Sequence, residues 1–226
     1  MSAVADSAPR AISVHAWRRD EADHYVEEPW VSRALFDAER LEGGVLDPAC
    51  GFGHILLSAA RAGIPCIGSD LFDRGAGDAI CELIDDPRND ETLIDVTTMY
   101  GHDFLSSDFP SEVCIREAGG PCRNIVCNPP FDELRRFTER AVGLAEGKVA
   151  IIFPTRRLNA AGTWLRQLPL RRIWFITPRP SMPPGAVYRQ LIAEGRRPQG
   201  GRQDFCWLVF ERGRKGPWTG GWLRRT

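Results

Sequence analysis

The sequence predicts an α/β fold: a mostly parallel sheet of about seven strands, with an antiparallel last strand and helices on both faces. Short apolar runs alternate with segments of helical periodicity, and most connections between them are long enough for crossover helices. The chain has 226 residues, of which 43% are hydrophobic and 26% charged. This composition suits one compact domain and excludes a fully disordered chain.

The elements follow one another in the order that such a sheet needs. A first helix is expected at 29–41, because apolar residues recur there at helical spacing and Pro29 suits a first turn. A short buried strand at 45–46 enters a glycine-rich turn, and Gly63 ends the helix that follows it. Further strands are expected at 65–68, 97–100, 124–127, 149–153, 172–177 and 205–210, and further helices at 78–84 and 134–145.

The chain divides into an arm, one domain and a tail. Residues 1–24 are polar and weakly patterned, so we expect a loosely held arm before a single domain at 25–211. The segment 178–203 is rich in Pro, Gly and Arg and too long for an ordinary connection. We expect it to be a basic insertion of the domain, and residues 212–226 to be a basic tail.

Several classes of protein are excluded at this level. The best apolar stretch, 149–153, is far shorter than the roughly 20 residues that cross a bilayer, so no membrane association is expected. No signal peptide is visible at the N-terminus. The seven cysteines are odd in number, scattered and without a CxxC pair, which indicates a reduced cytoplasmic protein with no metal site.

Charge is divided unevenly along the chain. Residues 1–120 hold 9 basic and 23 acidic residues, whereas residues 121–226 hold 20 basic and 7 acidic ones. High-GC coding can explain part of the preference for arginine over lysine, but it cannot explain this asymmetry. A basic half is typical of proteins that bind a polyanion, and the alternative is a solvated charged face.

Two acids close the first two predicted strands. Asp47 enters the turn Asp-Pro-Ala-Cys-Gly-Phe-Gly, where backbone N–H groups come close to a ligand. An acid at this strand end would repel a pyrophosphate and suits a cationic ligand, and the alternative is a generic turn between strand and helix. Asp70 ends the next strand, where an acid can hold ribose hydroxyls or cap a helix or turn.

A second motif, Asn128-Pro129-Pro130-Phe131, follows an apolar strand. The two prolines remove two N–H donors, fix the backbone and turn its carbonyl groups outward. The alternative is an ordinary proline-rich loop, with Phe131 as the first core residue of the next helix.

The two motifs together resemble class I S-adenosylmethionine-dependent methyltransferases. Their glycine-rich loop reads Asp-Pro-Ala-Cys-Gly-Ser-Gly in the amino-methyltransferases, so Phe52 replaces a small residue here and His54 is unusual. Asn-Pro-Pro-Phe/Tyr is the signature of the family members that methylate planar amino groups. The resemblance covers about residues 25–210 and implies a Rossmann-like class I methyltransferase fold with S-adenosylmethionine as cofactor.

The resemblance also assigns cofactor contacts. Asp103, at the third strand end, would accept a hydrogen bond from the adenine amino group, and Phe104 would pack on the ring, although this segment could be only a turn. Trp30 lies in a segment that resembles the cover over the methionine end, and it is equally well a core anchor. The assigned cofactor contacts are Trp30, Asp47, Pro48, Ala49, Cys50, Gly51, Gly53, Asp70, Leu71, Asp103, Phe104 and Asn128.

The catalytic assignment rests on the second motif: Asn128, Pro129, Pro130 and Phe131. An exocyclic amine is a poor nucleophile because its lone pair is delocalised. The Asn128 side-chain oxygen and the Pro129 carbonyl would each accept one N–H, which stabilises positive charge as the nitrogen attacks the methyl group. Phe131 would stack on a base rotated out of its helix.

Residues 154–226 would hold the nucleic acid. They contain 15 basic and 3 acidic residues, and guanidinium groups bind phosphates while aromatic faces stack on bases. The tryptophans interleaved with these charges are Trp164, Trp174, Trp218 and Trp222. Arg179-Pro180-Ser181 resembles an active-site loop of compact phage and bacterial adenine methyltransferases. The assigned contacts are Arg156, Arg157, Arg179, Arg189, Arg196, Arg197 and Arg202, with Arg171 and Arg172 also expected to contribute.

The order of the elements matches one class of DNA adenine methyltransferases, so adenine N6 in DNA is the expected target and nucleic acid the expected partner. A monomer is slightly favoured. The first alternative is adenine N6 or guanine N2 in structured RNA. Glutamine N5 of a protein comes next, followed by a catalytically silent module that binds the cofactor.

Overall fold

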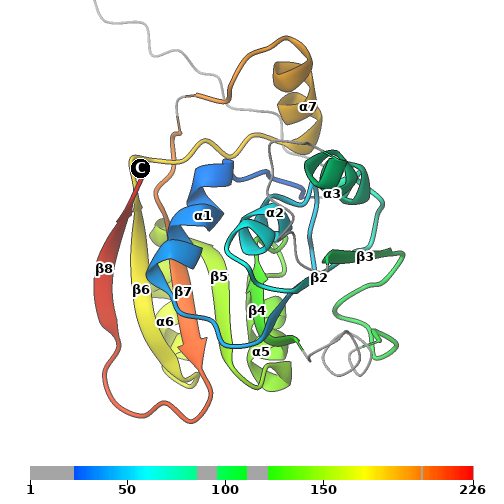
Figure 1. The fold of residues 1–226 in the computed structure, drawn as a ribbon. Helices are drawn as coiled ribbons and strands as arrows, with labels where there is room; N and C mark the ends of the chain where they lie inside the picture. The colour runs from blue at the N-terminus through cyan, green and yellow to red at the C-terminus, as the bar shows by residue number, and fades with distance from the viewer. Residues whose placement is uncertain (1–22, 86–95, 111–121, 200, 226) are drawn as a thin grey trace, which may run out of the picture.

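One eight-stranded sheet organises the part of the chain that the computed structural model describes, residues 23–85, 96–110, 122–199 and 201–225 (Figure 1). The strand order is β3-β2-β1-β4-β5-β7-β6-β8. The strands are β1 (Gly44–Asp47), β2 (Cys66–Asp70), β3 (Val96–Tyr100), β4 (Cys122–Cys127), β5 (Lys148–Pro154), β6 (Leu170–Thr177), β7 (Phe205–Glu211) and β8 (Thr219–Arg224).

The sheet is parallel except at β7, which runs antiparallel between β5 and β6. The predicted fold class is therefore confirmed, including the antiparallel strand at 205–210. One strand, β8, was not predicted. It lies within 212–226, expected as a basic tail, and pairs in parallel with β6 at the edge of the sheet.

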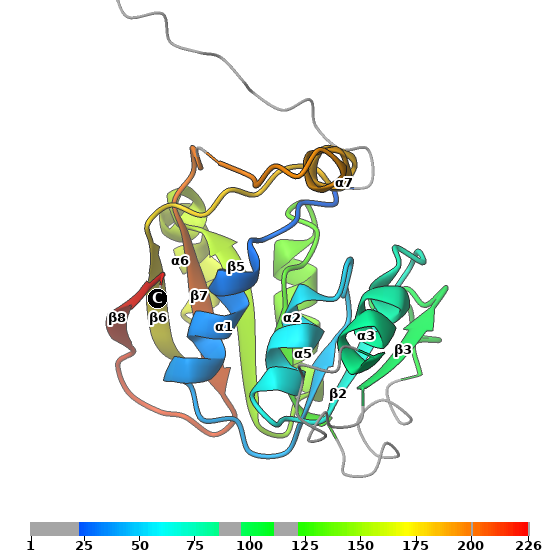
Figure 2. The same cartoon turned by 45° about the horizontal axis from the view of Figure 1, so that its top comes forward.

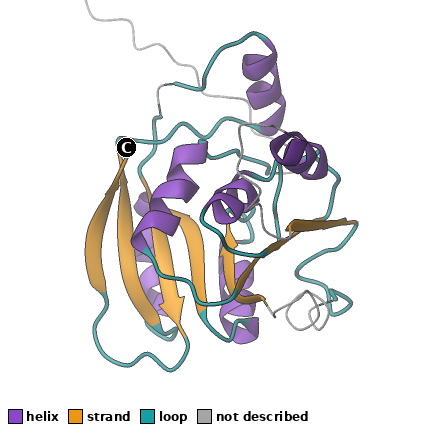
Figure 3. Ribbon diagram, in the orientation of Figure 1, coloured by secondary structure: helices purple, strands orange, loops and turns teal. Residues whose placement is uncertain are grey.

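Helices cover both faces of the sheet (Figures 2 and 3). Buried side chains on one face pack under α1, α2 and α3, and those on the other face pack under α5 and α6. Because neighbouring strand residues point to opposite faces, Val45 contributes to the first core and Leu46 to the second. The helices are α1 (Pro29–Ala38), α2 (His54–Arg61), α3 (Ala76–Asp85), α5 (Leu134–Leu144), α6 (Leu158–Leu165) and α7 (Gly185–Ala193).

Two helices, α6 and α7, were not predicted from the sequence pattern. The segment 178–203, expected as a long connection, contains α7, and α6 follows β5 through a single 3₁₀ turn, Thr155–Arg157. Helix α7 is flanked by the prolines and arginines that gave this segment its loop-like composition. The expected arm at 1–24 lies almost wholly outside the described residues.

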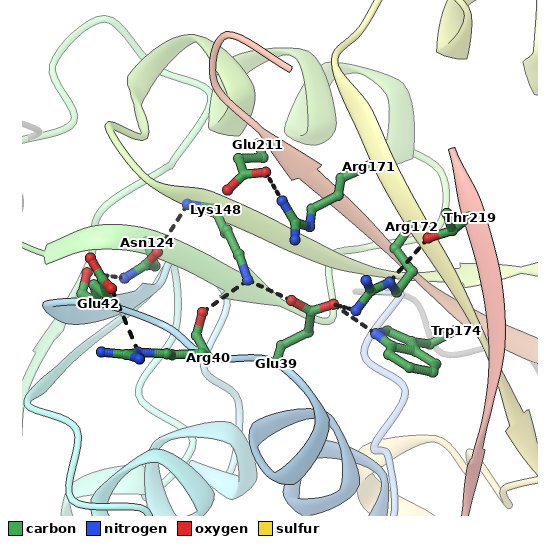
Figure 4. A network of polar contacts seen from close by, with 10 residues as sticks. All are labelled: Glu39, Arg40, Glu42, Asn124, Lys148, Arg171, Arg172, Trp174, Glu211 and Thr219. Carbon is green, nitrogen blue, oxygen red and sulfur yellow. Dashed lines mark hydrogen bonds and ion pairs between the residues drawn. The ribbon is translucent and has the colours of Figure 1, made fainter. Parts of the chain in front are cut away.

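A buried carboxylate fixes the end of α1 to the sheet (Figure 4). Glu39, only 3% exposed, accepts hydrogen bonds from Lys148 Nζ of β5 (2.6 Å), and from Arg172 (2.9 Å) and Trp174 Nε1 (2.9 Å) of β6. Arg172 also donates to Thr219 Oγ1 of β8 at 3.2 Å. Glu39 thus connects α1 to β5 and β6 directly, and to β8 through Arg172.

Arg171 and Arg172, which were expected to contribute to nucleic-acid binding, both have carboxylate partners within the protein. Arg172 pairs with Glu39 and lies over the Trp174 ring, 4.9 Å from its centroid. Arg171 pairs with Glu211 of the neighbouring β7. These two guanidinium groups hold the basic half of the sheet together.

Replacing Glu39 should destabilise the protein in a pH-dependent way. Burial disfavours the charged carboxylate, but hydrogen bonds from Lys148 and Trp174 and the charges of Lys148 and Arg172 outweigh it and lower the pKa of Glu39. E39Q should lower the free energy of unfolding at pH 7 by about 2–3 kcal/mol, less than for a fully buried pair. Because the folded-state pKa is the lower one, the Glu39 contribution is complete above the usual carboxylate pKa and is lost as the pH falls through the folded value.

Urea denaturation of E39Q and the wild type between pH 7 and pH 3 measures this difference. E42Q is the matched control, because the Glu42–Arg40 pair lies on the surface at 3.5 Å and should contribute at most about 1 kcal/mol. Equal stability of E39Q and E42Q would contradict a structural role of the Glu39 network.

Candidate functional site

A cavity of about 250 Å³ opens at the carboxyl ends of β1, β2 and β4. In a parallel sheet, the loops that follow neighbouring strands meet at this edge, and the strand order reverses direction here, between β1 and β4. Its lining includes eight of the predicted site residues: Pro48, Ala49, Asp70, Leu71, Asp103, Phe104, Asn128 and Pro130.

The glycine-rich turn forms the floor beside this cavity. Gly51 and Gly53 have φ values of 53° and 82°, a region that side chains with a Cβ rarely adopt. The Gly51 N–H donates to Asp70 Oδ2 at 2.9 Å, and the Cys50 N–H donates to the Ser69 carbonyl at 2.9 Å. The end of β2 therefore holds the turn after β1 in place.

Asp70 serves this turn and also lines the cavity. Its Oδ1 accepts the Phe72 N–H at 2.9 Å and lies 3.5 Å from Arg74 Nε. Asp103 behaves similarly: its Oδ1 accepts the Leu105 N–H at 2.8 Å while the residue borders the same cavity. Both acids thus act as turn residues and still face the space where a ligand would bind.

Asp47 lies beneath the cavity and is only 1% exposed. Burial, together with the nearby charges of Glu27 and Asp70, raises the pKa of Asp47 well above its usual value, although the Ala49 N–H donates to Oδ1 at 3.2 Å. Two buried acids, Asp47 and Glu27, therefore lie close together at the end of β1. A positive charge brought near them would offset this repulsion.

Asn128 directly follows β4 and is held by its amide nitrogen. Asn128 Nδ2 donates to the Tyr25 carbonyl and to Glu27 Oε2, each at 2.8 Å. Its Oδ1 is buried and accepts no hydrogen bond from the described residues. A buried acceptor without a donor raises the free energy of the folded protein, and an N–H group of a ligand would remove that cost.

A chain of polar contacts continues from Glu27 to the inserted helix α7. His54 Nδ1 lies 2.8 Å from the Glu27 carbonyl oxygen, which can only accept, so Nδ1 carries the hydrogen. In the neutral ring, Nε2 then accepts from the Tyr188 hydroxyl at 3.1 Å. Burial raises the pKa of the Glu27 carboxyl, and the nearby His54 and the hydrogen bond from Asn128 reduce that increase without cancelling it.

The residues before α1 pair with the residues before α7. Val26 N donates to the Pro183 carbonyl and Gly185 N donates to the His24 carbonyl, each at 3.0 Å. The Ser181 N–H donates to Glu28 Oε2 at 2.8 Å. We call residues 24–28 and 181–185 the strap. It crosses the end of the sheet and places Tyr25 at the cavity.

Phe52 and His54, the two departures from the family's loop, both contact α7. The Phe52 ring lies 5.6 Å from that of Tyr188, and the Arg189 guanidinium lies 4.9 Å above Phe52. His54 bonds Tyr188 as described above. Phe52 and His54 thus form the surface against which α7 packs.

The remaining predicted site residues lie outside the lining of the cavity. Trp30 is buried in the core under α1, which is the core-anchor alternative. Phe131 stacks with Tyr25 and with Phe205, each at 5.7 Å between ring centroids, so its ring is already engaged within the protein. The others are buried and do not line the cavity: Asp47, Cys50, Gly51, Gly53 and Pro129.

The predicted nucleic-acid contacts gather along one edge of the sheet. Arg156 and Arg157 follow β5, Arg179 follows β6, Arg189 lies on α7, and Arg196, Arg197 and Arg202 lie between α7 and β7. Pro154 pairs with Phe205 in the antiparallel ladder, so β7 begins where β5 ends. All seven arginines therefore belong to the edge at which the cavity opens.

Several of these arginines also have partners within the protein. Arg179 makes two hydrogen bonds to Asp204, at 2.6 and 3.1 Å. Arg196 pairs with Glu194 at 2.8 Å, and Arg157 donates to the Phe131 carbonyl. Such contacts leave the exposed guanidinium groups with donors for phosphate, since each carries five N–H bonds.

Sequence reasoning missed Tyr25 as a cavity residue, Glu27 as the partner of Asn128, and Tyr188. The signal that could have found Tyr188 was the pair of departures at Phe52 and His54, which implied an extra contact over the loop. Glu27 carried no local signal, because an acid before a helix-starting proline is common.

Solved structures similar to this one are methyltransferases. A predicted O-methyltransferase from Agrobacterium tumefaciens superposes with a TM-score of 0.56 at 12% identity, over 88% of this chain and 85% of that one. The M protein of the type I restriction enzyme EcoKI gives 0.56 at 15% identity, over 89% of this chain and 49% of that one. The chain has the Rossmann-like fold of class I methyltransferases.

A tRNA (uracil-54, C5)-methyltransferase from Pyrococcus abyssi is a further structural neighbour, with a TM-score of 0.50 at 12% identity over 80% of this chain and 37% of that one. No family model and no curated protein matches the sequence. Within the described ranges, no helix has the length and apolarity to cross a membrane, and no three potential metal ligands cluster.

Proposed function

We propose that this protein transfers a methyl group from S-adenosylmethionine to a planar amino group of a nucleic acid, with adenine N6 in DNA as the favoured target. The observation that carries the proposal is the side chain of Asn128, a residue that lines the cavity: its nitrogen is fixed by two hydrogen bonds, and its buried oxygen has no donor among the described residues.

The lining of the cavity fits this cofactor, which supplies a methyl group on a positively charged sulfonium. Asp70 would hold the ribose hydroxyls and Asp103 the adenine amino group, with Leu71 and Phe104 against the adenine ring. The buried acids Asp47 and Glu27 lower the cost of placing a cation nearby.

Asn128 would act on the amine that receives the methyl group. As the nitrogen attacks, it pyramidalises and becomes positive, and the Asn128 oxygen and the Pro129 carbonyl would each accept one of its N–H bonds. Both acceptors are fixed in advance, one by the Tyr25 and Glu27 bonds and the other by the proline ring. The bond between the methyl carbon and the sulfonium sulfur would break as the N–C bond forms, which leaves S-adenosylhomocysteine as the other product. One amine proton would leave to solvent, so that the methylated amine is neutral.

Tyr25 replaces Phe131 in this proposal as the platform for the target base. It lines the cavity, and its ring lies parallel to that of Phe131, with 12° between the ring planes. Phe131 would support Tyr25 from behind. An aromatic face at this place can hold a base that has left its helix.

Nucleic acid is the favoured substrate class because residues 154–226 carry 15 basic and 3 acidic residues, and seven of the arginines belong to the edge at which the cavity opens. DNA stands ahead of RNA on the order of the motifs. Structured RNA, glutamine N5 of a protein and a silent cofactor-binding module remain the alternatives, in that order.

Transfer of tritiated methyl groups from S-adenosylmethionine to DNA, RNA and bulk protein, followed by nucleoside chromatography, tests the proposal. N6-methyladenosine in RNA or N5-methylglutamine would replace the favoured target. No transfer to any of the three substrates would contradict an enzymatic role.

N128A should abolish most of the methyl transfer and leave the cofactor site intact. Loss of one preorganised acceptor costs about 10²–10³ in turnover, and the glycine-rich turn does not depend on this side chain. Single-turnover methylation measures the chemical step, and calorimetry with S-adenosylhomocysteine measures the affinity. N159A, at an exposed position of α6, is the matched control. Wild-type rates in N128A would refute the mechanism.

D70A should weaken S-adenosylhomocysteine binding tenfold or more, because the Gly51 N–H loses its acceptor and the ribose loses a charged partner. D73A controls for the loss of an acid in the same turn, since Asp73 is exposed and bonds only the Gly75 N–H among the described residues. Isothermal titration calorimetry measures both variants. Equal affinity in D70A and D73A would remove Asp70 from the site.

The acid limb of the pH profile should report on Glu27. Its raised pKa means that the carboxylate that orients Asn128 is lost as the pH falls through that value, so methyl transfer should decline there. The groups around Glu27 that can also titrate are Asp47, His54, Cys127 and Tyr188.

E27Q mimics the protonated acid and cannot titrate, so it should show the reduced low-pH turnover across the whole range and lose the decline. E27A removes the acceptor and should reduce turnover roughly tenfold. Measuring kcat from pH 5 to pH 8 separates the two variants. An unchanged acid limb in E27Q would assign the decline to another of these groups.

A further inference from the structure

The edge strand β8 exposes two tryptophans. Trp222 is 66% exposed and Trp218, immediately before the strand, is 51% exposed. Large aromatic side chains so open to water are a feature of surfaces that bind a partner. Neither residue lines the cavity proposed as the methyltransferase site.

The two tryptophans form one aromatic row with Phe175 of β6. Leu223 is buried on the face that α1 covers, so the neighbouring Trp222 points to the opposite face of the sheet. The Trp222 and Phe175 ring centroids are 5.1 Å apart. A side chain at Gly220 would contact Trp218 at 3.6 Å and Phe175 at 3.9 Å, so this glycine leaves the row open.

Positively charged residues lie on both sides of this aromatic row in the sequence. Residues 212–225 contain no acid and five basic residues: Arg212, Arg214, Lys215, Arg224 and Arg225. An open groove at the carboxyl ends of β6 and β8 is lined by Thr177, Pro178, Trp222, Arg224 and Arg225. These strand ends lie at the same edge of the sheet as the cavity, and Arg225 reaches Glu28 of the strap at 3.7 Å.

We propose that this β8 face binds a single-stranded segment of the nucleic acid next to the methylated residue, which rests on the proposed function. Trp218 and Trp222 are four residues apart, about 13 Å along an extended strand. That spacing leaves room for several stacked bases, and the basic residues at both ends of the strand would contact the phosphates. Aromatic side chains on an open sheet face bind single strands in this way, because every base offers a flat surface.

Anisotropy of a fluorescein-labelled 12-nucleotide single strand, as DNA and as RNA, tests the proposal on the full chain. W222L keeps an apolar side chain but removes the aromatic face, and W222F keeps that face. W222L should bind the strand about tenfold more weakly, and W222F should bind within about threefold of the wild type. R224Q should reduce the slope of log affinity against log salt by about one.

Three outcomes would overturn the proposal. The first is equal binding by W222L and the wild type. The second is no binding of single strands by the wild type. The third is a wild-type dimer in light scattering that W222L converts to a monomer, which would assign the face to self-association. Circular dichroism melting confirms that each variant is folded.

Failure of the proposed function would look different. Cofactor binding does not need the β8 face, so the affinity for S-adenosylhomocysteine should be unchanged in W222L. Absence of both cofactor binding and methyl transfer in the wild type would contradict the methyltransferase assignment, whatever the anisotropy shows.

Discussion

The geometry of the candidate site depends on two hydrogen bonds that take up both amide hydrogens of Asn128. They leave its oxygen, which has no donor among the described residues, as the acceptor for a ligand in the proposed reaction. The two acceptors, on Tyr25 and Glu27, belong to the segment before α1. This segment must therefore pass over the carboxyl end of β4, where Asn128 lies. That crossing is stabilised by backbone pairing with residues 183–185, and α7 anchors these residues through Tyr188 and His54. The inserted helix is thus part of the site and not an appendage to it.

Local patterns predicted every strand but β8, and the motifs at the strand ends predicted eight residues of the lining, because parallel strands end at one edge and their closing residues must meet there. Asp70 and Asn128 needed no knowledge of tertiary structure beyond that rule. The supporting contacts could not be predicted. Glu27 lies 101 residues from Asn128, and Tyr188 lies 134 from His54. No local spacing encodes such pairs, and α7 itself was concealed by the prolines, glycines and arginines that flank it.

The composition reveals the excess of arginine in the second half of the chain, but it cannot show which arginines form ion pairs within the protein. In the sequence, nothing distinguishes Arg171 and Arg172 from the other arginines of the basic half. In the structure, Arg171 pairs with Glu211 and Arg172 pairs with Glu39. The Arg172 guanidinium group lies over an indole ring and pairs with a buried acid, and both contacts stabilise the fold. The excess charge left for a polyanion therefore resides in the loops after β5 and β6, on α7 and beside β8, and not within β6.

The acidic and basic halves of the sequence become two halves of the sheet. The order β3-β2-β1-β4-β5-β7-β6-β8 places the strands of residues 1–120 on one side and those of residues 121–226 on the other. The boundary falls between β1 and β4, where the connections diverge and ligands of open α/β sheets bind. In the proposed reaction, a cationic cofactor would lie against the acids after β1 and β2, while a polyanion would lie along the arginines beyond β5. Asn128 follows β4, the first strand of the basic half, and so stands where the two must meet. In the proposed reaction, the charge asymmetry of the sequence would thus separate two ligands of opposite charge and bring them together at one edge.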